Sequence, residues 1–149
     1  MTTRVLVVCT GNSARSVLAE AILRQVGGDD VEVHSAGTEP KGIHPLTLRV
    51  LAEAGIDPTG LRSKSVTEYV GQSFDYVITV CDQARQVCPV FPGDGERLHW
   101  GTEDPAAVEG SEEERLRAFR RVFTQMSERI RTFVVLVQRA QREAAESTP

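Results

Sequence analysis

The stretch RVLVVCTGNSARS, residues 4–16, decides the fold of this chain. Its first part, Arg4–Cys9, is a β-branched apolar run that is typical of a strand buried on both faces in a parallel sheet. Gly11 and Asn12 interrupt the run, and apolar residues then recur at helical spacing over residues 17–26. The stretch therefore predicts a central strand, a tight loop and a helix that begins directly after the loop.

Strands and helices alternate along the rest of the chain. Three more strands are expected at residues 31–35, 75–80 and 98–100, because each stretch is apolar and is bounded by turn residues. A second helix is expected to begin at Pro45, with one buried face made of Leu48, Leu51 and Ala52. This alternation predicts a single α/β domain: a four-stranded parallel sheet with helices on both faces.

The last helix is the clearest element of the sequence. Ser111 and Glu114 form a capping-box pair at its start. The apolar residues that follow at helical spacing form one long face: Leu116, Phe119, Phe123, Met126, Ile130, Phe133, Val134 and Val137. The pattern fades after Arg139, so the domain is predicted to span residues 1–140, and the polar C-terminal tail, residues 141–149, is expected to fray.

Composition and charge limit the kinds of partner. The 149 residues suffice for one compact core, and 17 basic and 21 acidic side chains give a formal charge of -4, which argues against nucleic acid. The apolar run before Thr10 is too short for a signal peptide or a membrane span. A cytoplasmic protein without membrane contact is therefore expected.

The three cysteines are Cys9, Cys81 and Cys88. An odd number of cysteines does not pair fully, and a reducing cytosol would keep a structural disulfide open. Each cysteine could instead be a small buried apolar residue. Their neighbours in the sequence favour reactive thiols.

The loop after Cys9 has the composition of an anion-binding turn. Five residues separate this thiol from Arg15: Thr10, Gly11, Asn12, Ser13 and Ala14. Their backbone N–H groups can turn inward and form a nest at the helix N-terminus, which suits a tetrahedral oxyanion. Gly11 and Asn12 tolerate the positive φ angles that such a turn requires.

Arg15 and Ser16 add a charge and a hydroxyl group to this turn. Arg15 presents a planar fork of donors that suits two oxygens of phosphate or arsenate. Ser16 can donate to the Cys9 sulfur and, with the amides and the helix dipole, favours the thiolate, so Cys9 is predicted to be a nucleophile. The alternative is a glycine-containing turn with a buried Cys9 and a solvated Arg15. The combination of residue types between a strand and a helix favours oxyanion chemistry.

The loop CTGNSARS resembles that of the low-molecular-weight protein tyrosine phosphatases and of the arsenate reductases built on the same fold. The resemblance extends to Asp104-Pro105, which matches the Asp-Pro pair that supplies the general acid in that superfamily. It implies that Asp104 protonates the departing oxygen. His34, His44 and His99 form no ligand-like cluster, so neither a metal nor a bound cofactor is expected.

Cys81 and Cys88 decide which reaction is expected. They lie seven positions apart just after the third predicted strand, and ends of parallel strands share one sheet edge, so Cys81 should open near Cys9. Arsenate reduction takes two electrons, which three thiols can supply in sequence. Cys9 would form an arsenate adduct, Cys81 would attack the Cys9 sulfur and release arsenite, and Cys88 would then attack Cys81. Thioredoxin is the expected external reductant of the final disulfide.

Such a relay requires a change of conformation. A regular helix separates Cα atoms seven residues apart by roughly 10 Å, whereas a disulfide requires about 4.4 to 6.8 Å. Proline and glycine are frequent directly after Cys88. Residues 82–92 are therefore predicted to form a redox-switched segment.

The cysteine pattern, with Trp100 ahead of the Asp-Pro pair, is similar to that of the thioredoxin-coupled arsenate reductases, which implies a role in arsenic detoxification. Phosphatases of this fold carry Pro after the loop Arg-Ser and an aromatic residue after Asp-Pro, where this chain has Val17 and Ala106. Without an aromatic wall, a small inorganic oxyanion is favoured over phosphotyrosine. A tyrosine phosphatase and a non-catalytic thiol or oxyanion sensor are the alternatives, and weak phosphatase activity can persist in a reductase.

Some family members hold a potassium ion beside the loop through Asn, Glu, Ser and Asp residues. Asn12, Glu20 and Ser35 match these positions, but the fourth position is Lys64. The resemblance therefore implies that the Lys64 ammonium takes the place of the cation and pairs with Glu20. Activity is then expected to be independent of potassium.

Overall fold

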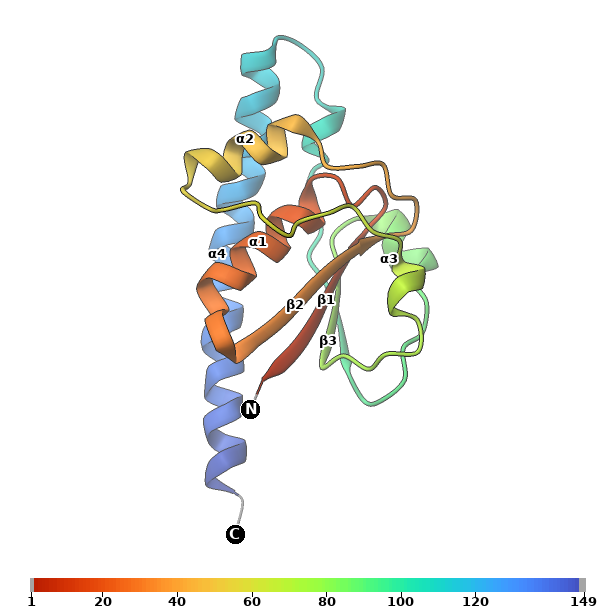
Figure 1. The fold of residues 1–149 in the computed structure, drawn as a ribbon, viewed down its shortest axis with the longest axis vertical. Coiled ribbons are helices and arrows are strands. Elements are labelled where there is room, and N and C mark those ends of the chain that lie inside the picture. Colours follow the sequence, from red (N-terminus) through yellow and green to blue (C-terminus); the bar gives the residue numbers. More distant parts are fainter. Residues whose placement is uncertain (1, 148–149) are drawn as a thin grey trace.

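The computed structural model describes residues 2–147 and contains one four-stranded sheet (Figure 1). Its strands are β1 (Thr3–Cys9), β2 (Val31–Gly37), β3 (Tyr76–Thr79) and β4 (Glu96–His99), in the spatial order β2-β1-β3-β4. Each neighbouring pair is parallel. The predicted α/β domain with a four-stranded parallel sheet is confirmed, although β4 begins two residues earlier than expected.

The central strand is β1, as the opening apolar run predicts. The side chains of residues 5–8 are fully buried, which is typical of a strand covered on both faces. In the register, Cys9 pairs with Gly37, and Val8 pairs with Thr79. The carboxyl ends of β1, β2 and β3 therefore meet at one edge, where open α/β sheets bind their ligands.

Helices cover both faces of the sheet (Figure 1). On one face α1 (Arg15–Gly27) and α4 (Glu112–Glu146) pack side by side on the sheet, with Phe133 of α4 against Tyr76 of β3, and α2 (Pro45–Glu53) packs against both helices. On the other face the short α3 (Asp82–Val87) contacts β1 and β3. Three short 3-10 turns complete the fold: η1 (Gly28–Asp30), η2 (Val66–Tyr69) and η3 (Pro105–Ala107).

The buried face of α2 differs from the predicted one. Leu46, Val50 and Leu51 are buried against α1 and α4, whereas Leu48 is 39% exposed and Ala52 is also exposed. Of the three residues predicted to form the buried face, only Leu51 is buried. A nine-residue helix with apolar residues on several sides can present more than one of them to the core, and the neighbouring helices select the side.

The last helix, α4, begins at the expected capping box and runs further than expected. The Glu114 N–H donates to Ser111 Oγ at 3.1 Å, and the predicted apolar face packs into the core. The helix continues through Glu146, so the fraying expected from residue 141 is not seen for residues 141–146. Gln141 Nε2 donates to Thr3 Oγ1 at 2.8 Å and to Asp30 O at 2.9 Å, which fastens this turn to the sheet. Residues 148 and 149 of the predicted tail lie outside the described residues.

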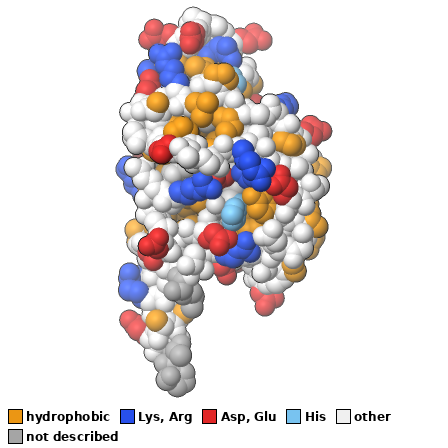
Figure 2. All heavy atoms as spheres, viewed as in Figure 1, with side chains coloured by type: hydrophobic (Ala, Val, Ile, Leu, Met, Phe, Trp, Pro, Cys, Tyr) orange, Lys and Arg blue, Asp and Glu red, His pale blue; other side chains and the backbone are white. Residues whose placement is uncertain are grey.

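The surface carries charges of both signs. Figure 2 shows acidic and basic side chains interspersed over the displayed face. No helix within residues 2–147 is long and apolar enough to cross a membrane.

Candidate active site

The loop after β1 is held from outside by the segment that follows β2, residues 38–44, which we call the strap. The strap donates backbone hydrogen bonds to four loop carbonyls: Thr38 to Cys9 at 3.1 Å, Glu39 to Thr10 at 2.8 Å, Lys41 to Gly11 at 2.9 Å and His44 to Ser13 at 3.1 Å. Within residues 2–147, the N–H groups of Gly11, Ser13 and Ala14 donate to no protein acceptor. With its carbonyls occupied, the loop keeps these donors available for an anion.

The positive φ angle expected in the loop occurs at one of its two predicted positions. Asn12 has φ of 44°, whereas Gly11 does not adopt a positive φ. A glycine that the sequence analysis missed is required instead at the end of β2. A Cβ on Gly37 would lie 2.6 Å from Thr10 O and 2.9 Å from Asn12 N, so only glycine lets the loop pack this closely against β2.

The Cys9 sulfur is buried and receives two hydrogen bonds. The Asn12 N–H donates to Cys9 Sγ at 3.1 Å, and Ser16 Oγ lies 2.7 Å from the sulfur. Because Ser16 Oγ accepts from Asn12 Nδ2 at 2.8 Å, its own O–H is free to donate to Cys9. Both donors lie against the sulfur that the sequence predicts to be the nucleophile.

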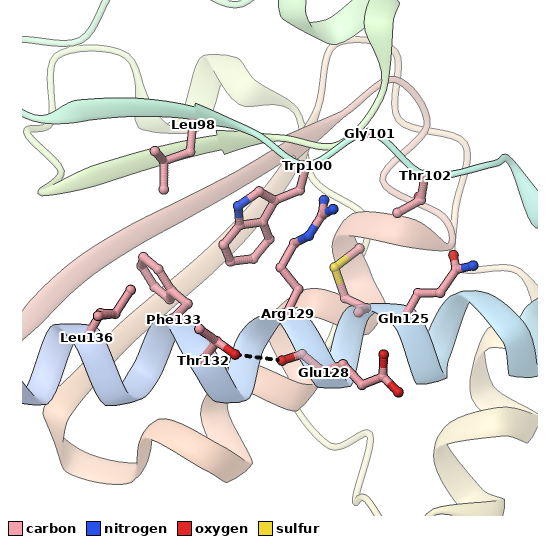
Figure 3. A pocket seen from close by; sticks show the side chains of 11 residues that line it. Leu98, Trp100, Gly101, Thr102, Gln125, Glu128, Arg129, Thr132, Phe133 and Leu136 are labelled. Carbon is pink, nitrogen blue, oxygen red and sulfur yellow. Dashed lines mark hydrogen bonds between the residues drawn. The ribbon is translucent and has the colours of Figure 1, made fainter.

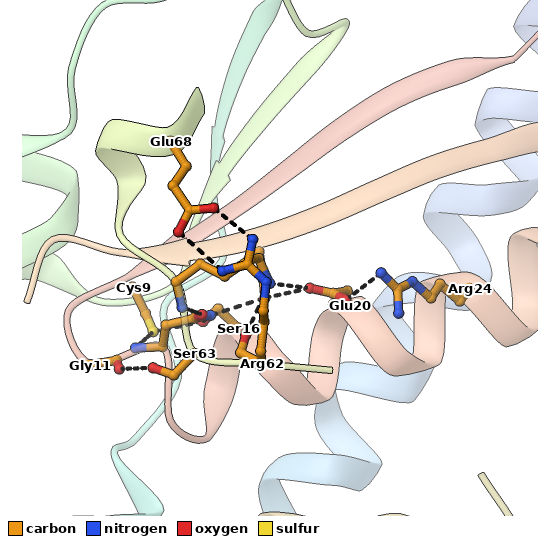
Figure 4. Close-up of polar contacts among 11 residues, drawn as sticks. Cys9, Gly11, Ser16, Glu20, Arg24, Arg62, Ser63 and Glu68 are labelled. Carbon is orange, nitrogen blue, oxygen red and sulfur yellow. Dashed lines mark hydrogen bonds and ion pairs between the residues drawn. The ribbon is translucent and has the colours of Figure 1, made fainter. Parts of the chain in front are cut away.

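A buried polar network lies behind the loop and includes Ser16 and Glu20 (Figure 4). Asn12 Nδ2 also donates to Ser35 Oγ at 2.9 Å, and Ser35 donates to Glu20 Oε1 at 2.6 Å. Lys64 Nζ lies 3.2 Å from Glu20 Oε1, and Arg24 Nη2 lies 2.7 Å from Glu20 Oε2. The Lys64 ammonium therefore pairs with Glu20 as expected, and two cations compensate the buried carboxylate.

Arg15 and Asp104 face each other at the rim of the loop. Arg15 Nη1 donates to Thr102 O at 3.1 Å, and Arg15 Nη2 lies 3.9 Å from Asp104 Oδ2. The other Asp104 oxygen accepts from the Ala106 N–H at 3.0 Å, which caps η3. These contacts hold the guanidinium and the carboxyl group next to each other.

A pocket of about 260 Å³ opens over the loop. Its lining combines the loop, the strap, the start of α3 and the Asp-Pro turn: Cys9, Thr10, Gly11, Ser13, Ala14, Arg15, Lys41, Cys81, Gln83, Asp104 and Ala106. Asn12 and Ser16 lie behind this lining and are fully buried. Lys41 and Gln83 are the lining residues that the sequence analysis missed, because no local pattern distinguishes them from other exposed polar residues.

Cys81 lies in the same pocket as Cys9. Its Sγ is 3.2 Å from Thr10 Oγ1, within hydrogen-bond distance, and Cys81 is the N-cap of α3. The structure therefore brings together the first two thiols of the predicted relay at one sheet edge.

Cys88 lies at the other end of α3 and outside the pocket lining. The first part of the predicted switch segment is a regular helical turn, in which Arg85 N donates to Cys81 O at 3.1 Å and Cys88 N donates to Ala84 O at 2.9 Å. Burial raises the pKa of the Cys88 thiol, and the nearby Arg97 guanidinium opposes this rise. Cys88 is therefore separated from both other thiols in this state.

A larger pocket lies elsewhere, between β4 and α4, with a volume of about 770 Å³ (Figure 3). Apolar side chains such as Trp100, Phe133 and Leu136 line it together with Arg129 and Glu128. It contains neither a cysteine nor a helix N-terminus. Within residues 2–147, no group of three or more His, Cys, Asp or Glu side chains is arranged to hold a metal. Cys9, Arg15 and the loop amides without an acceptor are concentrated in the smaller pocket, which we take as the candidate active site.

Comparison with known proteins agrees with this fold. The arsenate reductase of Halalkalibacterium halodurans is 42% identical over 125 residues, which cover 84% of this chain and 90% of that protein. A solved structure of an arsenate reductase in the phosphate binding state superimposes with a TM-score of 0.79 at 28% identity, over 91% of this chain and 99% of that chain. The thioredoxin-dependent arsenate reductase of Corynebacterium glutamicum gives a TM-score of 0.75 at 33% identity, over 93% of this chain and 63% of that chain.

The family model for low molecular weight phosphotyrosine protein phosphatases matches residues 4–145. This range includes the sheet except Thr3, the loop after β1 and all three cysteines. The chain therefore belongs to the low molecular weight phosphotyrosine protein phosphatase family.

Proposed function

We propose that this protein reduces arsenate to arsenite by a relay of three thiols and that thioredoxin regenerates it in the cytoplasm. The observation that carries the proposal is the presence of Cys9 and Cys81 in the lining of one pocket, which also contains Arg15. The similarity to arsenate reductases, one of them thioredoxin-dependent, supports it. A reducing compartment is required because each turnover consumes one dithiol.

The first step joins Cys9 to arsenic. The loop N–H groups and Arg15 bind the oxyanion, and the Cys9 thiolate attacks As(V). An oxygen leaves as water after Asp104 donates a proton to it. Asp104 lies in the pocket lining beside Arg15, where it can reach the departing oxygen. The product is an S–As adduct in which arsenic is still pentavalent.

The second step transfers the electrons. The Cys81 thiolate attacks Cys9 Sγ, the S–As bond breaks, and its electron pair goes to arsenic, which leaves as trivalent arsenite. Cys9 and Cys81 are then joined by a disulfide. Cys88 attacks the Cys81 sulfur and releases Cys9 as a thiolate, and the resulting Cys81–Cys88 disulfide is reduced by the dithiol of thioredoxin. No cofactor bound to the chain takes part.

The attack of Cys88 on Cys81, which is the third step, requires α3 to unwind. α3 has six residues, and of these only Ala84 is buried. Unwinding of α3 therefore exposes little apolar surface, and few contacts oppose the approach of Cys88 to Cys81. Residues 82–92 are the segment that we propose to change conformation on oxidation.

The rate of this third step should depend on pH through Cys88. Because burial raises its pKa, little thiolate is present at neutral pH. Disulfide transfer to Cys88 should therefore accelerate about tenfold per pH unit up to the raised pKa. Thiol trapping and mass spectrometry after a single arsenate turnover measure this rate. In Arg97→Gln, which lacks the opposing charge, the profile should move to higher pH, and a rate that does not change from roughly pH 6 to 8 would contradict the assignment.

Tyrosine phosphatase activity is the second candidate. The residues that line the pocket argue against it as the main function. Ala106 lies where an aromatic wall would hold a phosphotyrosine ring. Weak hydrolysis of small phosphate esters remains compatible with Cys9, Arg15 and Asp104.

The test is consumption of NADPH in a mixture of the protein, thioredoxin, thioredoxin reductase and arsenate. We expect continuous consumption that needs all four components and yields one arsenite per NADPH. Consumption that stops after a single equivalent would leave the thiol sensor as the better interpretation. Hydrolysis of phosphate esters without any arsenate reduction would favour the phosphatase.

A further inference from the structure

Lys41 reaches the candidate active site from the strap. Its backbone N–H donates to Gly11 O at 2.9 Å, and its side chain lines the pocket with Cys9 and Arg15. The Lys41 methylene groups lie across Gly11, with Cδ 3.5 Å and Cγ 3.7 Å from the position that a Gly11 Cβ would occupy. The ammonium is therefore carried along the loop that is expected to hold the oxyanion.

The Lys41 ammonium has no other partner among the described residues. No carboxylate in residues 2–147 forms an ion pair with it. The only other lysine of the chain, Lys64, is 5% exposed and is paired with Glu20. Lys41 is therefore the one lysine whose charge is available to a ligand.

The pocket would carry a net negative charge with an oxyanion bound if Arg15 were its only cation. Arg15 is the guanidinium of this lining, and Cys9, which attacks as a thiolate, adds a negative charge next to the anion. Arsenate and phosphate carry close to two negative charges at neutral pH. Arg15 alone would leave the occupied pocket strongly negative, which disfavours binding in a partly buried site.

We propose that Lys41 is the second cation of the oxyanion pocket, where its ammonium binds a non-bridging oxygen of a tetrahedral dianion and raises the affinity for arsenate. This inference rests on the proposed function for the identity of the substrate, but binding of the anion itself does not require the thiol relay. Lys41 acts on binding and not on the electron transfers. Its removal should therefore raise the KM for arsenate and leave the rate at saturating arsenate unchanged.

Binding of inorganic phosphate, measured by titration calorimetry, tests the proposal. We expect the Kd of Lys41→Met to be about tenfold higher than that of the unsubstituted protein, which is a low value for a hydrogen bond between charged groups because the site is open to water. Lys41→Arg should retain most of the affinity. Arg49→Met is the matched control, because it removes one positive charge from an exposed ion pair on α2, outside the pocket lining.

Labelling of amines gives an independent measure that needs no substitution. Lys41 should react readily with an amine-selective reagent, phosphate should protect it, and the buried Lys64 should react slowly in either case. Peptide mass spectrometry separates the two sites.

The outcomes distinguish this proposal from the proposed function. Equal phosphate affinity of Lys41→Met and the unsubstituted protein, or labelling of Lys41 that phosphate does not slow, would overturn the role of Lys41 alone. A failure of the unsubstituted protein to bind phosphate at all would overturn the oxyanion pocket and with it the proposed function. If Lys41→Met is poorly folded by circular dichroism, Lys41→Arg and the labelling experiment decide the matter.

Discussion

Cys88→Ser should stop arsenate reduction after about one arsenite per chain. Cys9 and Cys81 remain in the same pocket in this variant, so the adduct forms and Cys81 releases arsenite. The Cys9–Cys81 disulfide then has no internal thiol to resolve it, and it lies in a pocket that thioredoxin does not enter easily. Arsenite quantified against protein, together with NADPH consumption, shows the burst and the missing steady state.

Two controls make this result specific. Hydrolysis of a small phosphate ester needs Cys9, Arg15 and Asp104 but not Cys88, so it should survive in Cys88→Ser at its original rate. Gln86→Ser, at an exposed position of the same helix, should keep full arsenate turnover. Continuous turnover of Cys88→Ser with thioredoxin would show that the third thiol is not needed, and the relay would have to be abandoned.

Lys64→Met should lower the free energy of unfolding by about 3 kcal/mol. Lys64 is 5% exposed, and its removal leaves the fully buried Glu20 with Arg24 as its remaining cation. A loss of this size corresponds to a fall in Tm of roughly 6 to 12 °C for a chain of this length. Because Glu20 holds Ser35 and Asn12, the loop around Cys9 should also loosen and the KM for arsenate should rise.

The control for Lys64→Met lies two residues away. Arg62 forms an exposed ion pair with Glu68 at 2.6 Å, so Arg62→Met should change stability by less than about 1 kcal/mol. Combining Lys64→Met with Glu20→Gln removes the buried charge and should recover part of the loss. In the unsubstituted protein, exchange of sodium for potassium should leave Tm unchanged. A potassium-specific rise in Tm would mean that the Lys64 ammonium does not replace a cation.

Local patterns were sufficient to predict the elements that carry the chemistry. The apolar run of β1, the loop residues and the start of α1 are contiguous, so their geometry depends mainly on their own sequence. The meeting of Cys9 and Cys81 could be predicted as well, because it follows from the parallel order of β1 and β3. The capping box of α4 is equally local.

The features that could not be predicted depend on contacts between distant segments. Gly37 is required by the close approach of Thr10, which no pattern around Gly37 reveals. Lys41 reaches the pocket because the strap runs beside the loop, and α4 continues past residue 140 because Gln141 meets Thr3. The buried side of α2 was chosen by α1 and α4. In each case the residue can be read from the sequence, but the segment that it contacts is known only from the folded structure.

The four backbone hydrogen bonds from the strap make the loop preorganised for its ligand. Peptide groups whose carbonyls are already bonded cannot rotate freely, so the entropy of ordering them is lost during folding and not during association with arsenate. A site of this kind can bind a very small ligand, which makes too few contacts to order a floppy loop by itself. Its affinity should therefore be sensitive to changes in the strap that touch no atom of the anion.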